Sequence, residues 1–362
     1  MKSFTVKKTY EKLLHSPFLN LPGKLFSKSN SLSHKKSKTA LQNPKGVNML
    51  FSFILYTCAL FADGATDAAN SVTGAVSSKA IKISVACAFS ALLTFIGCII
   101  FCTFFPAVFE NTAAVWEIDK RLAPIALCAS LAAVSLWSLI AWIMGLPTSE
   151  GHALVSSAAG SALALSGRIS TFHFTFAALG MIPVLLICFA SSVLFTKILA
   201  KINMGEKTKK YLVIASTALS SILHGAQDGQ KFLALAMGMA LFSKDKAFQM
   251  VVFTGLIMSL GTILAGQRII KSMGESAAPS TIESALAADI ASCLSLIVLT
   301  FFGIIASTTH AKMTALAAAS RAAGEKVSVS TLLLMLLAWI ATFPLCFALS
   351  FFLSKLFYII FL

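Results

Sequence analysis

Apolar segments of about 20 residues recur from residue 48 to the end of this 362-residue chain. An α-helix needs about that many apolar residues to cross the hydrocarbon core of a bilayer. Hydrophobic residues make up 57% of the sequence and charged residues 12%, whereas soluble proteins have about 45–50% and about 25%. The chain is therefore predicted to be an all-α polytopic protein of the cell membrane, surrounded by lipid, with no appended soluble enzyme.

Most of the net charge of +15 belongs to residues 1–47, which hold ten lysines and a single acid, Glu11. This basic tail is expected to be largely disordered, and Met49, where the apolar region begins, is a candidate for the true start. The other basic residues cluster in short loops, where they orient a protein in the membrane. Nucleic acid is therefore not an expected partner. The cysteines lie scattered in apolar segments and indicate packing, so no cofactor is expected.

Ten helical segments are predicted, of which the first and sixth are interrupted by polar residues. They span 49–80, 82–105, 122–146, 150–166, 172–197, 211–243, 247–267, 282–306, 309–321 and 329–361. Residues 48–200 then form a first transmembrane repeat, 201–210 a basic linker and 211–362 a second repeat.

The loop charges set the expected orientation. Residues 106–121 contain Glu110, Glu117 and Asp119, and the basic linker lies on the opposite face, which should be the cytoplasm. The predicted number of crossings places the basic tail on the external face of the membrane, against the positive-inside tendency. A re-entrant segment, such as 150–166, would remove that conflict.

Two polar motifs occur twice, in the same order. The segment GATDAAN contains Asp67 and returns in the second half of the chain as GAQDGQK, which contains Asp228. The segment TSEGH, with Ser149, matches ASTTH, with Ser307, and each serine follows the aspartate of its own half at nearly the same spacing. Two motifs that keep their order and spacing indicate internal duplication. With five crossings in each half, the second repeat is predicted to be inverted, with its motifs at the bilayer midplane.

The motifs predict broken helices. The apolar run Met49–Ala62 has 14 residues, about 21 Å of helix, which is too short for about 30 Å of hydrocarbon. The chain is expected to continue past a break at Gly64, with a matching break at Gly225 and further breaks before Ser149 and Ser307. Such backbone is tolerated at this depth only around a polar or protein-lined cavity.

Helices that start at these breaks would direct free N–H groups and positive dipole ends into the cavity, as an anion site requires. Asp67 and Asp228 would repel the anion unless Na⁺ or a proton binds beside them, and this requirement couples the two solutes. These two aspartates are the predicted cation-binding residues, and they are metal ligands if the coupling ion is Na⁺. The predicted substrate-binding residues are Thr66, Asn70, Ser149, Gln227, Gln230, Ser307, Thr308 and Thr309.

Structural roles are the alternatives for several polar residues. Asp63 is interpreted as the cap of the next helix, and the Ser/Thr residues can also serve helix packing. His152 and His310 are expected to be structural rather than proton relays. Further candidate intramembrane charges, which can pair with one another, are Glu150, Lys231, Glu283, Asp289 and Lys312.

The segments GATDAANSVTGAV, HGAQDGQK, GLPTSEGHAL and STTH resemble the signature segments of the inorganic phosphate transporter (PiT) family. The resemblance covers residues 49–362. It implies a Na⁺- or proton-coupled symporter of inorganic phosphate that works by alternating access, and it is compatible with a homodimer.

The chain departs from the family pattern in three segments, one of which reads Ser149-Glu150-Gly151-His152 in place of STTH. Thr66 and Gln227 stand where the family has Asn, and Glu150 adds a negative charge beside an expected anion site. The coupling ion therefore stays open, and so does the choice between phosphate and another tetrahedral oxyanion such as sulfate. An intramembrane aspartyl protease that uses Asp67 and Asp228 as an acid/base pair is a further alternative, but it gives no reason for the repeated serines.

Overall fold

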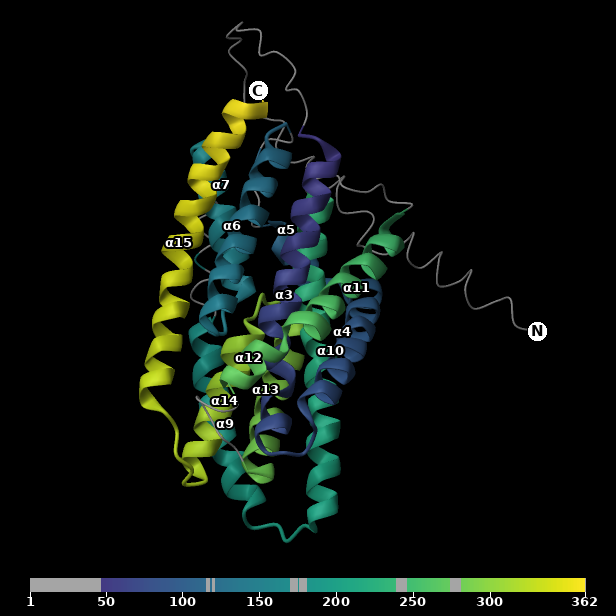
Figure 1. Ribbon diagram of the computed structural model, residues 1–362, viewed down its shortest axis with the longest axis vertical. Coiled ribbons are helices and arrows are strands. Elements are labelled where there is room, and N and C mark those ends of the chain that lie inside the picture. The colour runs from purple at the N-terminus through teal and green to yellow at the C-terminus, as the bar shows by residue number, and fades with distance from the viewer. Residues whose placement is uncertain are drawn as a thin grey trace, which may run out of the picture.

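The computed structural model describes residues 47–114, 118, 121–169, 175, 181–238, 246–273 and 281–361. Every regular element in these ranges is a helix (Figure 1), which confirms the all-α prediction. The basic tail up to residue 46 lies outside the described residues, as do Glu117 and Asp119 of the acidic loop. The helices are α3 (Met49–Ser77), α4 (Ile83–Phe104), α5 (Ala107–Ala114), α6 (Ala123–Met144), α7 (Glu150–Ser166), α9 (Met181–Leu199), α10 (Glu206–Gly238), α11 (Ala247–Ala265), α12 (Gln267–Ser272), α13 (Ile282–Phe301), α14 (Thr308–Ala322) and α15 (Val329–Phe361).

Seven helices of the described ranges are long and apolar enough to cross a membrane: α3, α4, α6, α9, α11, α13 and α15. Helix α10 has 33 residues and is more polar; it includes residues 206–210 of the predicted linker. Large apolar side chains such as Leu186, Leu264 and Phe352 are exposed on the outside of the bundle, where lipid would cover them. The chain is thus a multi-pass integral membrane protein.

The predicted breaks at Gly64 and Gly225 are wrong, because both residues lie inside continuous helices, α3 and α10. The two glycines allow close helix packing instead. A Cβ atom on Gly64 would lie 1.9 Å from the carbonyl oxygen of Met258 in α11, and one on Gly225 would lie 2.0 Å from that of Thr94 in α4. Small residues permit such approach between membrane helices. The polar residues of α3 are tolerated because they face the inside of the bundle, where they are buried.

The breaks predicted before Ser149 and Ser307 are present. Gly145, with a φ of 70°, ends α6, and the side chain of Ser149 caps α7. Gly303, with a φ of 69°, lies in the matching loop after α13, and the side chain of Ser307 caps α14. Glycine adopts positive φ without the steric cost that other residues meet.

Each of these loops joins the arms of an antiparallel helical hairpin. In hairpin 1 (residues 123–166), Ser130 near the start of α6 contacts Ser161 near the end of α7, with 2.7 Å between their hydroxyl oxygens. In hairpin 2 (residues 282–322), Ser284 near the start of α13 donates to Glu325, just after α14, at 2.8 Å.

The lengths of α7 and α14 bear on the predicted number of membrane crossings. Helices α7 and α14 have 17 and 15 residues, about 25 and 22 Å of helix, which is less than the hydrocarbon thickness of about 30 Å. The segments 150–166 and 309–321 are therefore second arms of hairpins that are too short to cross on their own. We predict that both arms of each hairpin enter from one side of the membrane, which leaves three crossings in each half, an odd number. An inverted second repeat remains the prediction.

Helices α3 and α10, which carry the two aspartate motifs and are called the motif helices below, run in opposite directions. Ser71 of α3 lies 2.8 Å from Ser90 of α4 across the turn that joins them, so these two helices are antiparallel. Ser221 of α10 donates to Ser90 at 3.2 Å, and further along both chains Gly229 packs against Cys98, so α10 runs parallel to α4. Helix α10 therefore runs opposite to α3.

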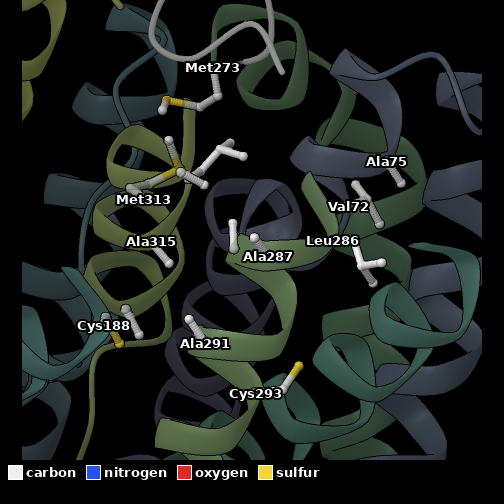
Figure 2. Packing of buried hydrophobic residues seen from close by; sticks show 14 of the residues in the cluster. Val72, Ala75, Cys188, Met273, Leu286, Ala287, Ala291, Cys293, Met313 and Ala315 are labelled. Carbon is white, nitrogen blue, oxygen red and sulfur yellow. The ribbon is translucent and has the colours of Figure 1, made fainter. Parts of the chain in front are cut away.

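Small residues fill the core around hairpin 2. Figure 2 shows Ala287 and Ala291 of α13 between Met313 of α14 on one side and Val72 of α3 on the other. Helices α9 and α14 pack together on one side of the bundle, and α15 and α7 on another. The two hairpins are thereby held with their loops inside the protein.

Candidate functional site

The loops of the two hairpins, residues 145–149 and 303–307, meet in the middle of the bundle and are called the hairpin tips below. The hydroxyl of Thr309, in the first turn of α14, donates to the backbone oxygen of Thr148 at 2.6 Å. The rings of His152 and His310 lie 4.4 Å apart between their centroids. The two N-termini of α7 and α14 thus lie beside one another.

The first turn of α14 contacts both predicted cation-binding residues. The hydroxyl oxygen of Thr309 lies 3.2 Å from Oδ1 of Asp67 in α3, and that of Thr308 lies 3.4 Å from Oδ2 of Asp228 in α10. Asn70, one turn after Asp67, donates to Thr309 at 2.9 Å and to Thr308 at 3.3 Å. The structure thus brings together five residues that the sequence assigned to one site.

Asp228 has two nitrogen-bearing neighbours on its own helix. Lys231 donates to its Oδ1 at 2.5 Å, and Nδ1 of His224 lies 2.8 Å from its Oδ2. The same lysine donates to the backbone oxygen of Ala306 in the tip of hairpin 2 at 2.6 Å. Lys231 thereby links α10 to the hairpin tip. The paired motifs do not single out His224, although it stands at the head of the second motif.

Asp63 does not cap a helix, because it lies in the interior of α3. It is fully buried, and neither carboxylate oxygen has a hydrogen-bond partner among the described residues. One ligand atom each from Asp63, His224 and Asp228 lies within 4.8 Å of the other two. Two carboxylates and an imidazole at this spacing suit a cation.

Two departures from the family pattern contact each other. The hydroxyl oxygen of Thr66 lies 3.0 Å from Oε1 of Glu150, the first residue of α7. Ser138 of α6 lies 2.7 Å from the same oxygen, and Thr148 lies 3.3 Å from it. Thr66 therefore faces a carboxyl group in hairpin 1.

Gln227 supports the tip of hairpin 2. Its amide nitrogen donates to the hydroxyl of Thr300 at 2.9 Å, and its amide oxygen accepts from the backbone N–H of Ala306 at 3.4 Å. Ser149 and Ser307 accept from backbone N–H groups in the first turns of α7 and α14, as N-cap residues do. Both serines are buried.

Gln230 lies apart from the hairpin tips. Its side-chain oxygen accepts from the N–H groups of Val108 and Phe109 in the first turn of α5, at 3.0 and 3.1 Å. In a continuous helix two residues are about 200° apart around the axis, so Gln230 points away from Asp228. Gln230 therefore does not join the other predicted substrate-binding residues at the hairpin tips.

The remaining membrane charges form pairs away from this site. Lys312 bonds to Asp289 within hairpin 2, and Lys209 lies 2.6 Å from Glu283 at one end of the bundle. These pairs join neighbouring helices, so we treat them as structural.

The sequence matches the model of the phosphate transporter family over residues 63–350. The chain belongs to this family. It is 27% identical over 320 residues to a probable low-affinity inorganic phosphate transporter of Bacillus subtilis (strain 168), over 82% of this chain and 94% of the relative. A probable low-affinity inorganic phosphate transporter of Rhizobium meliloti (strain 1021) is 27% identical over 305 residues, 78% of this chain and 89% of the relative.

A solved structure described as the sodium-dependent phosphate transporter superposes with a TM-score of 0.75 at 20% sequence identity, over 86% of this chain and 99% of that one. At that identity the match shows a shared fold. The phosphate transporter family and these relatives are transporters, so the chain is not an enzyme, and the aspartyl protease interpretation is set aside. As a member of the family it is a multi-pass protein of the cell membrane.

Proposed function

We propose that this member of the phosphate transporter family carries inorganic phosphate across the membrane together with Na⁺ or protons, by alternating access. The observation that carries the proposal is the first turn of α14, where Thr308 contacts Asp228 and Thr309 contacts Asp67. One helical turn thereby touches both motif helices at the N-terminus where an anion would bind.

The hairpin tips supply donors for a tetrahedral oxyanion. The N-termini of α7 and α14 present backbone N–H groups and positive dipole ends, which favour anions. Asn70, Thr308 and Thr309 now bond to one another or to the two aspartates. The same groups, with the hydroxyls of Ser149 and Ser307, turn to phosphate oxygens when the substrate binds.

The buried charges require a cation before an anion enters. Four carboxyl groups, on Asp63, Asp67, Glu150 and Asp228, are at most 1% exposed, and Lys231 is the buried lysine that pairs with one of them. An isolated carboxylate at the bilayer centre costs about 2.5–3.5 kcal/mol on insertion scales. Bound Na⁺ or protons offset this cost and remove the repulsion of the substrate. Asp63, His224 and Asp228, whose ligand atoms lie within 4.8 Å of one another, are a candidate cation site among the described residues.

Alternating access is supported by the burial of the site and by the helix directions. Asp67, Asn70, Thr308 and Thr309 are at most 2% exposed, so the site is closed to both faces in this conformation. The opposed directions of α3 and α10 suit two halves that rock around a central site, as inverted repeats do in secondary transporters. The closed structure would be an intermediate of that movement.

The proposal is tested by uptake of labelled phosphate into proteoliposomes under an imposed Na⁺ gradient, an imposed proton gradient, or neither. Sulfate and arsenate serve as competitors. We expect gradient-dependent accumulation of phosphate that arsenate inhibits and sulfate does not. Accumulation of sulfate in place of phosphate would overturn the substrate assignment, and uptake that no gradient stimulates would overturn coupling.

A further inference from the structure

Glu150 is a buried carboxyl group at the start of α7, beside the proposed phosphate site. It is 1% exposed, its Oε2 atom has no hydrogen-bond partner among the described residues, and no lysine or arginine of those residues pairs with it. A carboxylate in such a place is strongly disfavoured by the loss of its hydration. It therefore needs either a cation or a proton.

The groups around Oε1 can serve the charged and the neutral form without moving. The hydroxyl of Ser138 lies 2.7 Å from Oε1 and 2.9 Å from the backbone oxygen of Val134. The hydroxyl of Thr66 lies 3.0 Å from Oε1 and 2.8 Å from the backbone oxygen of Ala62. Each hydroxyl has one hydrogen to donate and lone pairs to accept with.

Two hydrogen-bond patterns therefore fit the same atoms. When Glu150 is ionised, the hydroxyl hydrogens of Ser138, Thr66 and Thr148 turn toward Oε1. When it is protonated, the carboxyl group donates to one hydroxyl oxygen, and the hydroxyls of Ser138 and Thr66 turn back to their helix carbonyls. Proton gain and loss then cost little rearrangement.

Other titratable groups face Glu150 from the packed helices. Asp63 and Asp67 of α3 and Asp228 of α10 interact with it electrostatically, and a Cβ atom on Gly151, the next residue, would lie 3.3 Å from Nζ of Lys231 in α10. Cys346 of α15 faces it as a buried thiol, and α6 contributes the neutral Ser138. The charge of Glu150 thus depends on whether cations occupy the neighbouring aspartates.

We propose that Glu150 is a proton-binding site of the transport cycle, built by the contact between Glu150 and Thr66. The proton comes from water on one side of the membrane, resides on a carboxyl oxygen while phosphate is carried, and returns to water on the other side. This inference rests on the proposed phosphate transport, and it assigns at least part of the coupling to protons.

The first test needs no transport. Infrared spectra of the purified protein are recorded across a pH titration for the wild type, Glu150→Gln and the matched control Glu206→Gln, which alters an exposed acid. We expect a pH-dependent component of the carboxylic-acid carbonyl band in the wild type and the control that is missing in Glu150→Gln, in which the buried aspartates still absorb. The same pH-dependent component in all three proteins would overturn the proton site.

The second test separates exchange from net transport in proteoliposomes. Gln mimics the protonated side chain, so Glu150→Gln should keep phosphate/phosphate exchange within about twofold, lose proton-driven accumulation and lose its pH dependence. Glu150→Asp should recover part of the pH dependence.

A variant that has lost exchange although correctly folded, or that still accumulates phosphate with protons, contradicts the proposal. If sodium drives uptake without proton movement and Glu150→Gln abolishes the sodium dependence, Glu150 is a sodium ligand instead. A wild type without any uptake refutes the transport proposal and leaves the infrared result to decide the proton site.

Discussion

At the scale of single residues, the buried aspartates of the site differ in their surroundings, because different side chains lie beside each of them. Asp228 has a lysine and a histidine beside it, Asp67 has a threonine hydroxyl, and Asp63 has no partner among the described residues. An unpartnered buried carboxylate is the one that gains most from a bound cation. We therefore propose that Asp63 shares a cation site with Asp228, and its burial, which the sequence does not reveal, supports this.

Asp63→Asn should make the purified protein more stable in sodium-free buffer, because it removes an unpaired buried charge. The expected gain is about 1 kcal/mol or more, the size of a typical penalty for an unsatisfied buried group. Addition of Na⁺ should stabilise the wild type and leave the variant unchanged. Thermal unfolding in detergent measures both. A less stable variant, or an equal sodium response, contradicts a cation at Asp63.

Thr309→Val should lower phosphate uptake by about tenfold or more without loss of protein from the membrane. The substitution keeps the shape of the side chain but removes the hydroxyl that contacts Asp67 and Thr148. Leaving buried acceptors unpaired costs about 1–3 kcal/mol. Thr57→Val, which alters a hydroxyl bonded only to its own helix, is the control and should transport normally. Equal uptake by both variants would remove Thr309 from the site.

At the scale of helices, the sequence predicted two of four breaks correctly. The loops before Ser149 and Ser307 were recognisable because glycine precedes a residue that caps the next helix. The motif around Gly64 combines glycine with polar residues, which also suggests a break. There the glycine serves a close helix crossing, and such a crossing depends on α11, a partner helix that lies far away in the sequence.

Gly64→Ala and Gly225→Ala should each destabilise the protein by about 1–3 kcal/mol, the usual cost of overpacking. The new Cβ atoms would meet backbone oxygens at 1.9 and 2.0 Å, and backbone cannot move aside as a side chain can. Gly205→Ala, where nothing lies within 4 Å, is the control. Thermal unfolding in detergent compares the three. Stable variants at Gly64 and Gly225 would indicate that the helices are broken there after all.

The pair between Lys312 and Asp289 should stabilise hairpin 2. Removing one partner of a buried pair costs about 3–5 kcal/mol, because the other charge stays buried. Lys312→Met is therefore expected to destabilise strongly, and the double variant Lys312→Met with Asp289→Asn should recover more than half of the loss. Unfolding measurements on the single and double variants give the coupling. Additive losses would show that the two residues act independently.

At the scale of the whole molecule, composition was sufficient for the fold class, because the membrane class follows from the apolar composition. The paired motifs predicted that Asn70, Asp228, Thr308 and Thr309 lie close to Asp67, as the structure has them, and their roles stay predictions. Gln230 was predicted to lie near Asp228 but points away from it, because its direction depends on α10 being continuous. The short arms α7 and α14 were counted as crossings, because hairpin arms and crossings have similar apolar composition. The inverted symmetry and the homodimer stay predictions.

We propose that cations bound at the buried aspartates, Asp63, Asp67 and Asp228, allow phosphate to bind at the hairpin tips. The most direct test is gradient-driven phosphate accumulation in proteoliposomes, measured side by side for the wild type and Asp228→Ala at matched amounts of inserted protein. The account predicts accumulation by the wild type and none by the variant. Accumulation of phosphate by Asp228→Ala at the wild-type level would contradict it.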